Sequence, residues 1–393
     1  MSIWKECESL QEELVQMRRE LHQIPEFGFD LPKTQAYVVK VLEELGIPYK
    51  CSSKDSGIIA EIKGTTPGKT VALRADMDAL KIQEENDVEY KSKHEGLMHA
   101  CGHDTHITML LGAAKVLNKH KDEIQGTVRL VFQTAEELAK GSQVIIQEGA
   151  MDGVDAVFGQ HIGCIMGKEI ANGKIIALRG CSMASYDRFA IKVNGQGCHG
   201  STPEKGIDPV NIASHIVIAL QEIIAREVAA VKPAVVTIGM IHGGVAYNAI
   251  PSVVEIEGTI RAVEEDVRQY LAKRIKEISE LSANTFGGNA EVKIDWGAPP
   301  VTNNDQMVAL VVDAAKEVVG EENVVTEMPA PNMGGEDFAY YLQKVPGAFF
   351  FLSSSNPEKH TDTPHHNSHF NVDEDVLYKG SAMFVKIVED YLK

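Results

Sequence analysis

The sequence has 393 residues, of which 44% are hydrophobic and 24% are charged. These values are typical of a folded globular protein, and the length favours two domains over one. The formal net charge is −18, from 38 basic and 56 acidic side chains. Such a surface repels phosphate backbones and anionic membranes, so nucleic acid is not an expected partner.

We expect a cytoplasmic protein with no membrane partner. The first residues, MSIWKECESLQEELVQM, lack a basic region followed by an apolar core. No apolar run approaches the roughly 20 residues that span a bilayer. The six cysteines are scattered without a CxxC pair, which is typical of a reduced, cytosolic chain.

The first part of the chain alternates predicted helices and strands. Helical spacing covers KECESLQEELVQMRRELHQ and PKTQAYVVKVLEELG, and short β-branched runs predict strands at SGIIAEIKG and KTVALRAD. A predicted helix, HITMLLGAAKVLNKH, is followed by the strands GTVRLVFQ and DAVFGQH. This alternation predicts an α/β fold with a largely parallel sheet covered on both faces.

The pattern changes near residue 183. The segments SYDRFAIKVNGQG, NIASHIVIALQEIIAREV, AVVTIGMIHGG, SVVEIEGTIRAV, a helix over about 263–281 and AEVKIDW follow in order. This order, β-α-β-β-α-β, is that of a ferredoxin-like unit. After the Pro-rich GAPPVTNN, a helix (DQMVALVVDAAKEVV) and a strand (GAFFFLSSS) resume the first pattern. The prediction is a catalytic domain formed by residues 1–182 and 298–393, with an α+β domain, residues 183–297, inserted into it.

Side chains that can bind a metal follow several predicted strands. They are Asp76 after KTVALRAD, Glu136 and Glu137 after GTVRLVFQ, His161 at the end of DAVFGQH, the group Cys101, His103, Asp104 and His106 just before a helix, and His360, His365, His366 and His369 on a late loop. In open parallel sheets, sites form outside the carboxyl ends of the strands. Each residue alone is more often an ordinary polar or packing residue, but their joint occurrence favours a metal site.

The adjacent Glu136 and Glu137 suggest two separate roles. If the chain is still extended there, their side chains point in opposite directions. One carboxylate could then bind a metal while the other takes a proton from a metal-bound water, the division that metal hydrolases need.

Eight motifs in chain order resemble those of the co-catalytic metallo-aminoacylase and carboxypeptidase superfamily. They are MHACGHDTH, TAEE, GQHIG, GCHGSTPEKGIDP, AYNAIP, GTIRA, MGGEDF and PHHNSHFNVDED. The branch that the sequence resembles holds the hippurate hydrolases, the indoleacetyl-amino-acid hydrolases and the N-acetyl-diaminopimelate deacetylases. Matches run from RRELHQIPE to NVDED and so cover the whole chain. The resemblance implies an aminopeptidase-like α/β catalytic domain with an inserted ferredoxin-like lid.

The resemblance also implies two divalent metal ions per subunit. The implied ligands are Cys101, His103, Glu137, His161 and His366. Cys101 stands where relatives use a bridging carboxylate, and Arg74 stands where other branches have a ligand histidine. His366 follows from aligning PHHNSHF with a Pro-x-His-Ser-Pro pattern, from which Asn367-Ser368 departs. Mn, Zn, Ni and Co are the candidate metals, since thiolate and imidazole favour Zn or Ni while carboxylate and water admit Mn.

The implied reaction is hydrolysis of N-acyl-L-amino acids, of the hippurate or N-acetyl-diaminopimelate type, to a carboxylate and a free amino acid. A hydroxide that bridges the metals attacks the amide carbonyl, with Glu136 as the general base, and Asp76 matches an aspartate that orients ligands. His106 is expected to be structural.

Substrate binding is implied for residues outside the first domain segment. These residues are His199, Asn248, Arg261 and Gly335. Asn248 and Arg261 would hold the substrate carboxylate, because a guanidinium fork suits its two oxygens. His199 would act near the carbonyl, in its own or in the neighbouring subunit's site, and Gly335 would present its backbone. A homodimer through the lid is expected, because an inserted sheet with a free edge can pair across a two-fold axis.

Three other functions remain open at this point. A metallo-dipeptidase or carboxypeptidase of the same superfamily would use the same metals. A cysteine amidase would use Cys101 as a nucleophile activated by His103, but this leaves Glu137 and His161 without a role. A non-catalytic binding protein would have no need of Glu136.

Overall fold

The computed structural model describes residues 2–393, which form two compact units. Unit 1 contains the chain up to Ser182, Val301–Asn332 and Asp337–Lys393, and unit 2 contains Met183–Pro300 and Met333–Glu336. Within residues 2–393, no helix combines the length and the apolar character that a membrane crossing requires.

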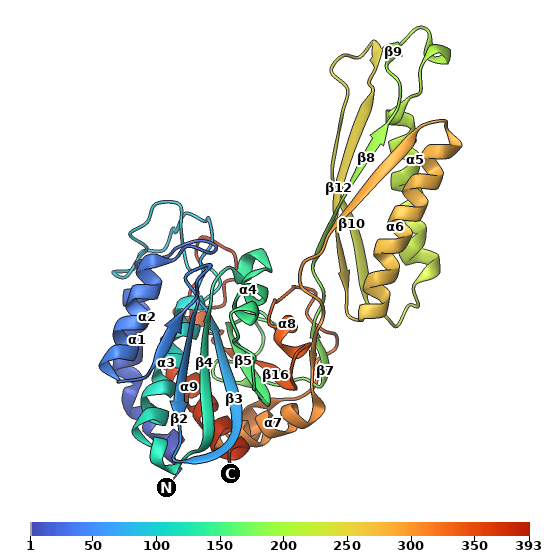
Figure 1. Cartoon of the computed structure of the whole chain (residues 1–393). Coiled ribbons are helices and arrows are strands. Elements are labelled where there is room, and N and C mark those ends of the chain that lie inside the picture. Colours follow the sequence, from blue (N-terminus) through green and yellow to red (C-terminus); the bar gives the residue numbers. More distant parts are fainter. Residues whose placement is uncertain (1) are drawn as a thin grey trace. The chain divides into compact units, whose positions relative to one another are not determined.

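Unit 1 is built on an eight-stranded mixed sheet (Figure 1). In order across the sheet, the strands are β1 (Tyr49–Cys51), β2 (Ile58–Lys63), β4 (Gln125–Gln133), β3 (Thr66–Asp76), β5 (Ala156–Gly163), β16 (Gly347–Ser353), β6 (Ile175–Ile176) and β15 (Val324–Val325). The central strands β4, β3, β5 and β16 are parallel, whereas β1, β2 and β4 pair antiparallel. The predicted α/β class with a largely parallel sheet is confirmed.

Most helices of unit 1 bury one face of this sheet. The helical elements of unit 1 are η1 (Ile3–Leu10), α1 (Gln11–His22), α2 (Pro32–Glu44), α3 (His103–Lys119), α4 (Gly141–Gln147), α7 (Asp305–Val319), α8 (Ala339–Leu342) and α9 (Leu377–Tyr391). One hydrophobic core joins α1, α2, α3, α7 and α9 to alternate strand residues such as Val71, Leu73 and Ala75 of β3, whereas α4 and α8 are not part of that core. The intervening residues, among them Arg74 and Asp76, therefore point to the opposite face.

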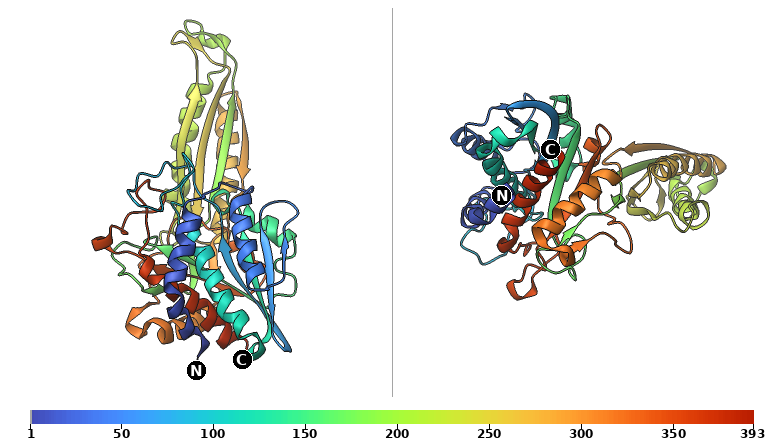
Figure 2. Two further views of the ribbon diagram at one scale, coloured as in Figure 1. Left: turned by 90° about the vertical axis from the view of Figure 1, so that its left-hand side faces the viewer. Right: turned by 90° about the horizontal axis from the view of Figure 1, so that it is seen from below.

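The two ends of unit 1 meet, because η1 packs against α9 (Figure 2). The backbone N–H of Ile3 donates to Glu389 Oε1 over 3.1 Å. The sequence analysis did not single out α9, most of whose residues are buried. It also placed the start of α3 at His106, whereas the helix begins earlier, at His103.

Unit 2 contains a four-stranded antiparallel sheet covered on one face by two helices. The strands, in order across the sheet, are β10 (Ala234–Gly243), β12 (Val253–Ala262), β8 (Asp187–Asn194) and β13 (Asn289–Asp295), and the helices are α5 (Pro209–Glu222) and α6 (Glu265–Thr285). Burial alternates along β8, as expected for a sheet with one solvated face. A small ribbon of β9 (Cys198–His199) and β11 (Ala249–Ile250) extends one end of the unit.

Candidate metal centre

Two parallel strands of unit 1 carry metal-capable side chains at their carboxyl ends. Asp76 is the last residue of β3, and His161 lies near the end of β5. Arg74 pairs with Gly159 in the sheet, so Asp76 and His161 each stand two residues further along, on the face away from the helical core. This is the edge of the sheet at which the sequence predicted a site.

The turn before α3 places a thiol and an imidazole side by side. Cys101 precedes Gly102, whose φ of 89° lies in the left-handed region, and His103 begins the helix. A Cβ atom on Gly102 would lie 2.9 Å from Ile162 Cγ2, so the close approach of this turn to β5 requires glycine. Cys101 and His103 are both buried.

Backbone carbonyls fix the tautomers of two histidines. His103 Nδ1 donates to the carbonyl of Asp78 over 2.8 Å, and His161 Nδ1 donates to that of Ile162 over 2.8 Å. A carbonyl oxygen only accepts, so Nδ1 carries a proton in each ring. Among residues 2–393, the buried Nε2 atom of His103 has no hydrogen-bond partner, and that of His161 lies 3.4 Å from Cys101 Sγ. This is how proteins usually orient metal-ligating histidines.

His106 has a different role, because both of its ring nitrogens are engaged. Nδ1 donates to Asp76 Oδ1 over 2.5 Å, and Nε2 accepts the backbone N–H of Ile162 over 3.0 Å. No nitrogen of His106 is left for a metal in this arrangement. The histidine instead orients Asp76, whose Oδ2 lies 3.5 Å from His103 Nε2.

Glu136 and Glu137 do not lie on an extended chain, so that premise of the sequence analysis is wrong. They begin a 3-10 turn, Glu136–Leu138, that follows Ala135 at a φ of 50°. The turn forms because the carboxylate of Asp78 accepts the backbone N–H of Glu136 over 3.0 Å and that of Glu137 over 3.1 Å. Both side chains still reach the site, since Oε2 of Glu136 and Oε1 of Glu137 each lie 3.9 Å from His103 Nε2.

The late loop contributes His366. Its backbone has a φ of 61°, and its N–H donates to the carbonyl of Ala100 over 2.9 Å. Its Nε2 lies 3.3 Å from Glu137 Oε1, an atom that otherwise makes no aligned hydrogen bond. His365 instead donates to a backbone carbonyl, and His369 is exposed beside Glu85. Of these three histidines, only His366 contacts the carboxylate of Glu137.

Among the described residues, two groups of donor atoms share one thiol, and a further group joins His103, Glu136 and Glu137. Donor atoms of Cys101, His103 and His161 lie within 4.8 Å of one another, and so do those of Cys101, Glu137 and His366. Thiolate, imidazole and carboxylate are the donors that divalent transition metals prefer. A bound cation would give the buried Nε2 atom of His103 the partner that it lacks among the described residues. Together with the two donor groups, this atom shows that the residues fit a metal pair.

Burial and neighbouring charges set the protonation states around the shared thiol. Burial, with His106 and His365 nearby, lowers the pKa of His161, which keeps the imidazole neutral. Burial alone would lower the pKa of His103, but Asp76 and the other carboxylates around it raise it to about 10. Burial and the adjacent carboxylates raise the pKa of the Cys101 thiol well above its ordinary value.

Sequence reasoning missed a buried ionic network behind the site. The Arg74 guanidinium lies 2.8 Å from Asp76 Oδ2 and 3.0 Å from Asp337 Oδ1, and its Nε donates to Gln133 Oε1 over 2.9 Å. The backbone N–H of Asp337 donates to Glu136 Oε1 over 3.4 Å. Arg74 thus connects the carboxylate beside His103 with the segment that contacts Glu136. The acidic residues of RADMD and MGGEDF were the only sequence signals for Asp78 and Asp337.

The residues predicted to bind substrate lie in unit 2, at two separate places. Arg261, near the end of β12, stacks its guanidinium 4.2 Å from the ring of Tyr186, and Gly335 packs against the same tyrosine. His199 and Asn248 adjoin on the β9–β11 ribbon, beyond the start of β12 (Figure 1). The length of β12 separates the two places by roughly 25 Å at about 3.3 Å per residue. One copy of unit 2 therefore does not bring Asn248 and Arg261 to a single carboxylate.

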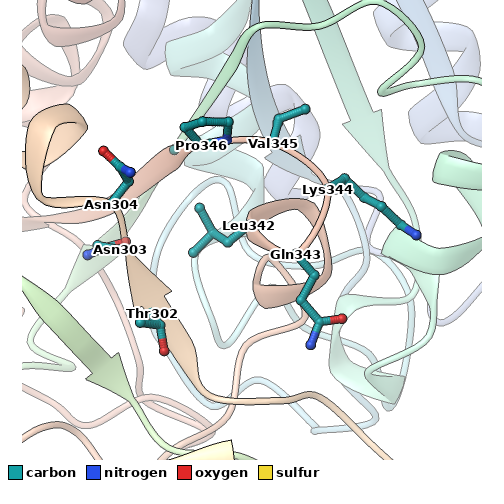
Figure 3. A pocket seen from close by; sticks show the side chains of 9 residues that line it. Thr302, Asn303, Asn304, Leu342, Gln343, Lys344, Val345 and Pro346 are labelled. Carbon is teal, nitrogen blue, oxygen red and sulfur yellow. The ribbon is translucent and has the colours of Figure 1, made fainter.

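A separate hollow in unit 1 is not part of this site. It encloses about 420 Å³ around the amino end of β16, between Asn303, Leu342 and Gly347 (Figure 3). Its lining contains no carboxylate, imidazole or thiol. His161 pairs with Phe351, further towards the carboxyl end of β16.

Comparison with known proteins agrees with this geometry. The model of the peptidase family M20/M25/M40 matches residues 72–390. The chain is 40% identical to the N-acetyl-L-cysteine deacetylase of Bacillus subtilis (strain 168), over 95% of this chain and 86% of the relative. It is 41% identical to thermostable carboxypeptidase 2 of Saccharolobus solfataricus, over 96% of this chain and 94% of the relative.

Further relatives extend the agreement to plants and to solved structures. The chain is 37% identical to the IAA-amino acid hydrolase ILR1-like 4 of Arabidopsis thaliana, over 96% of this chain and 86% of the relative. The crystal structure of the Bacillus subtilis YXEP protein, described as a dinuclear metal binding peptidase from the M20 family, superposes with a TM-score of 0.84. That protein is 34% identical, and the alignment covers 98% of this chain and 99% of that chain.

Fold, donor set and relatives together define a metal-dependent hydrolase that acts on amide bonds. The chain belongs to peptidase family M20/M25/M40, and its relatives include the amidohydrolase branch that the motifs resembled.

Proposed function

We propose that the protein hydrolyses N-acyl-L-amino acids to a carboxylate and a free amino acid. The observation that carries this proposal is the largely buried donor set around His103, with the carboxylate of Glu136 beside it. The names of the bacterial deacetylase and the plant hydrolase support an acyl-amino-acid substrate.

We propose two divalent ions per subunit, held by Cys101, His103, Glu137, His161 and His366, with Zn, Ni, Mn and Co as candidates. When bound, such a pair lowers the pKa of a shared water towards about 7 and polarises the scissile carbonyl. Cys101 belongs to both donor groups, so its sulfur would help to hold the pair. A cytoplasmic location remains a proposal that rests on the scattered cysteines.

Glu136 is the proposed general base. Its carboxylate takes a proton from the attacking water as the new C–O bond forms at the amide carbonyl carbon. It then gives that proton to the leaving nitrogen as the C–N bond breaks, so that the products are a carboxylate and an amine. Asp78 holds the backbone of Glu136, and Asp76 acts through His103 and His106 to keep the donor set in place.

A cysteine nucleophile is the weaker candidate. An activated thiol needs a lowered pKa or a base that removes its proton. Burial and Glu137 instead raise the pKa of Cys101, and the lowered pKa of the neighbouring His161 makes its imidazole a weak acceptor for the thiol proton. A carboxypeptidase activity, as named for the archaeal relative, differs from the proposed one in substrate rather than in machinery.

A substrate panel separates these functions. The protein reconstituted with Zn²⁺ or Mn²⁺ is assayed on N-acetyl, N-benzoyl and longer N-acyl amino acids and on dipeptides, with detection of the released amine. We expect turnover of the N-acyl amino acids and its loss on chelation. Turnover of dipeptides alone would favour a peptidase, an acyl-enzyme trapped in metal-free protein would favour Cys101 as a nucleophile, and an inert metal-loaded protein would contradict catalysis.

Metal loading is expected to release protons. Below pH 10 His103 is protonated in the metal-free protein, and Cys101 is a thiol, whereas both must lose a proton to bind a cation. Metal affinity should therefore fall as the pH falls from 9 to 6. Titration calorimetry with Zn²⁺ in two buffers of different ionisation enthalpy measures the release, which a Cys101→Ser variant should reduce. An apparent enthalpy that is the same in both buffers would contradict this prediction.

We also propose a homodimer through unit 2. Strand β10 is an outer strand of its sheet and pairs only with β12 among the described residues. Its Met240 and Ile241 are 47% and 52% exposed, and Val245 and Tyr247 beyond it are fully exposed. A long apolar edge of this kind pairs readily with a second copy. Light scattering at micromolar concentration should give a dimer for the native chain and for Leu281→Lys, but a monomer for Ile241→Lys. A monomeric native chain would contradict the proposal.

The separation of the substrate-binding residues supports a role for His199 and Asn248 in the partner's site. Mixing subunits tests this directly, because Glu136→Gln and His199→Ala are each expected to be inactive alone. If His199 acts across the dimer, re-assembly of the two variants at equal amounts restores about a quarter of native activity, since half of the dimers carry one intact site in two. No recovery in proven heterodimers would place His199 in its own subunit's site.

A further inference from the structure

The backbone of one residue, Ile162, connects three histidines around the candidate metal centre through its N–H and its carbonyl. Its N–H donates to His106 Nε2 over 3.0 Å, and its carbonyl accepts from His161 Nδ1 over 2.8 Å. The same carbonyl accepts a second bond, from His365 Nε2 over 3.0 Å. The direction of this carbonyl therefore decides which nitrogen of His161 faces Cys101.

The His365 side chain packs closely against this part of the backbone. Its ring meets that of His161 edge to face, with 5.1 Å between centroids, and lies 4.7 Å from the ring of Phe370. Gly163 has a φ of 108°, and a side chain there would overlap the His365 imidazole. The loop is held in place just before this residue, because Cys164 Sγ donates to the carbonyl of Thr363 over 3.2 Å.

We infer that His365 is a positioning residue, which acts through the Ile162 carbonyl and the His161 ring to keep His161 Nε2 directed at the metal centre. Two donors on one carbonyl fix its direction, and the edge of the His365 ring blocks rotation of the His161 ring. His365 Nε2 donates its proton to the Ile162 carbonyl, so this nitrogen does not compete with His366 for a cation. Partners of this kind orient ligands and typically alter metal affinity by about 10–100-fold when lost. The expected effect on metal affinity rests on the proposed function, whereas the hydrogen bonds and ring contacts do not depend on it.

Three variants on one loop test the inference. His365→Leu removes both the donor and the ring, His365→Gln keeps an N–H donor, and His369→Leu removes an exposed histidine whose contacts are to Glu85 and Ser368. Zn²⁺ affinity is measured by competition with a chelator. Nitrogen-15 spectra of the histidine side chains in the metal-free protein report which ring nitrogen of His161 carries the proton.

We expect His365→Leu to weaken Zn²⁺ binding by roughly 10–100-fold and to give His161 a mixture of tautomers. His365→Gln should recover most of the affinity, and His369→Leu should bind as the native protein does. Native affinity and a pure Nδ1–H tautomer in His365→Leu would overturn the inference, as would a His365→Gln variant as weak as His365→Leu. If His365→Leu does not fold, the nitrogen-15 spectrum of the native protein tests the inference instead. The absence of a proton on His365 Nε2, or on His161 Nδ1, would then overturn it.

The spectra need neither metal nor substrate. A protein that fails on every N-acyl amino acid but keeps these tautomers would contradict the proposed function and leave the inference standing.

Discussion

Replacing Glu136 by Gln is expected to lower kcat of the metal-loaded protein by roughly 10²–10⁴-fold. The amide has nearly the same shape as the carboxylate, and its oxygen can still accept the N–H of Asp337, which lies 3.4 Å from Oε1 in the native protein. It cannot take a proton from water, so the chemical step loses its base. Because Glu136 is not one of the proposed ligands, the metal content should stay unchanged.

Glu137→Gln is the matched control for this prediction. The two glutamates share one turn, and the same Asp78 carboxylate holds both backbones. Loss of the Glu137 carboxylate should lower the metal content itself, which elemental analysis after gel filtration measures. Turnover of Glu136→Gln close to that of the native protein, at full metal content, would remove Glu136 from the mechanism.

Replacing Arg18 by Met is expected to lower the free energy of unfolding of unit 1 by about 3–5 kcal/mol. Arg18 is completely buried, with Nε 2.9 Å from Asp104 Oδ2 and further bonds to Glu374 and Asn371. Its removal would leave the buried carboxylate of Asp104 with His22 as its remaining ionic partner among the residues that the structure describes. Asp104 lies in the first turn of α3, next to His103, so the network also supports the metal centre.

Arg19→Met provides the control. Arg19 is 41% exposed and pairs with the same Glu374, so its loss should cost less than about 1 kcal/mol. Urea unfolding followed by the fluorescence of Trp4, in a Trp296→Phe background, reports on unit 1. Equal costs for the two arginine variants would contradict the assignment of Arg18 as the centre of this network.

Much of the fold was predictable because its periodicities are local. The helix DQMVALVVDAAKEVV matches α7, Asp305–Val319, and alternation along SYDRFAIKVNGQG indicated the half-solvated β8. Position within the sheet was not predictable in the same way. The pairing of β16 between β5 and β6 depends on contacts between distant parts of the chain, to which no local pattern refers.

The candidate site was likewise predictable where it depends on local patterns and not where it depends on distant contacts. Asp76 and His161 could be located because they follow recognisable parallel strands, whose carboxyl ends share one edge. The turn at Glu136 could not, since a left-handed Ala135 and the carboxylate of the distant Asp78 create it. Which late histidine faces the carboxylate likewise depends on the positive φ of His366 and its bond to Ala100. Motif alignment named that residue, but the sequence pattern alone left several histidines equivalent.

The late position of β16 in the chain affects how the protein folds while it is being synthesised on the ribosome. When β5 has emerged, its fully buried segment AVFGQHIG has no neighbour on one side, because the strand that covers it is encoded after unit 2. At a synthesis rate of about 5–20 residues per second, this edge of β5 stays unpaired for on the order of ten to forty seconds, until β16 has been made. Unit 2, whose core comes almost wholly from one continuous stretch, can fold during the delay. His366 is made later still, so a nascent chain completes its cation-binding donors only near the end of synthesis.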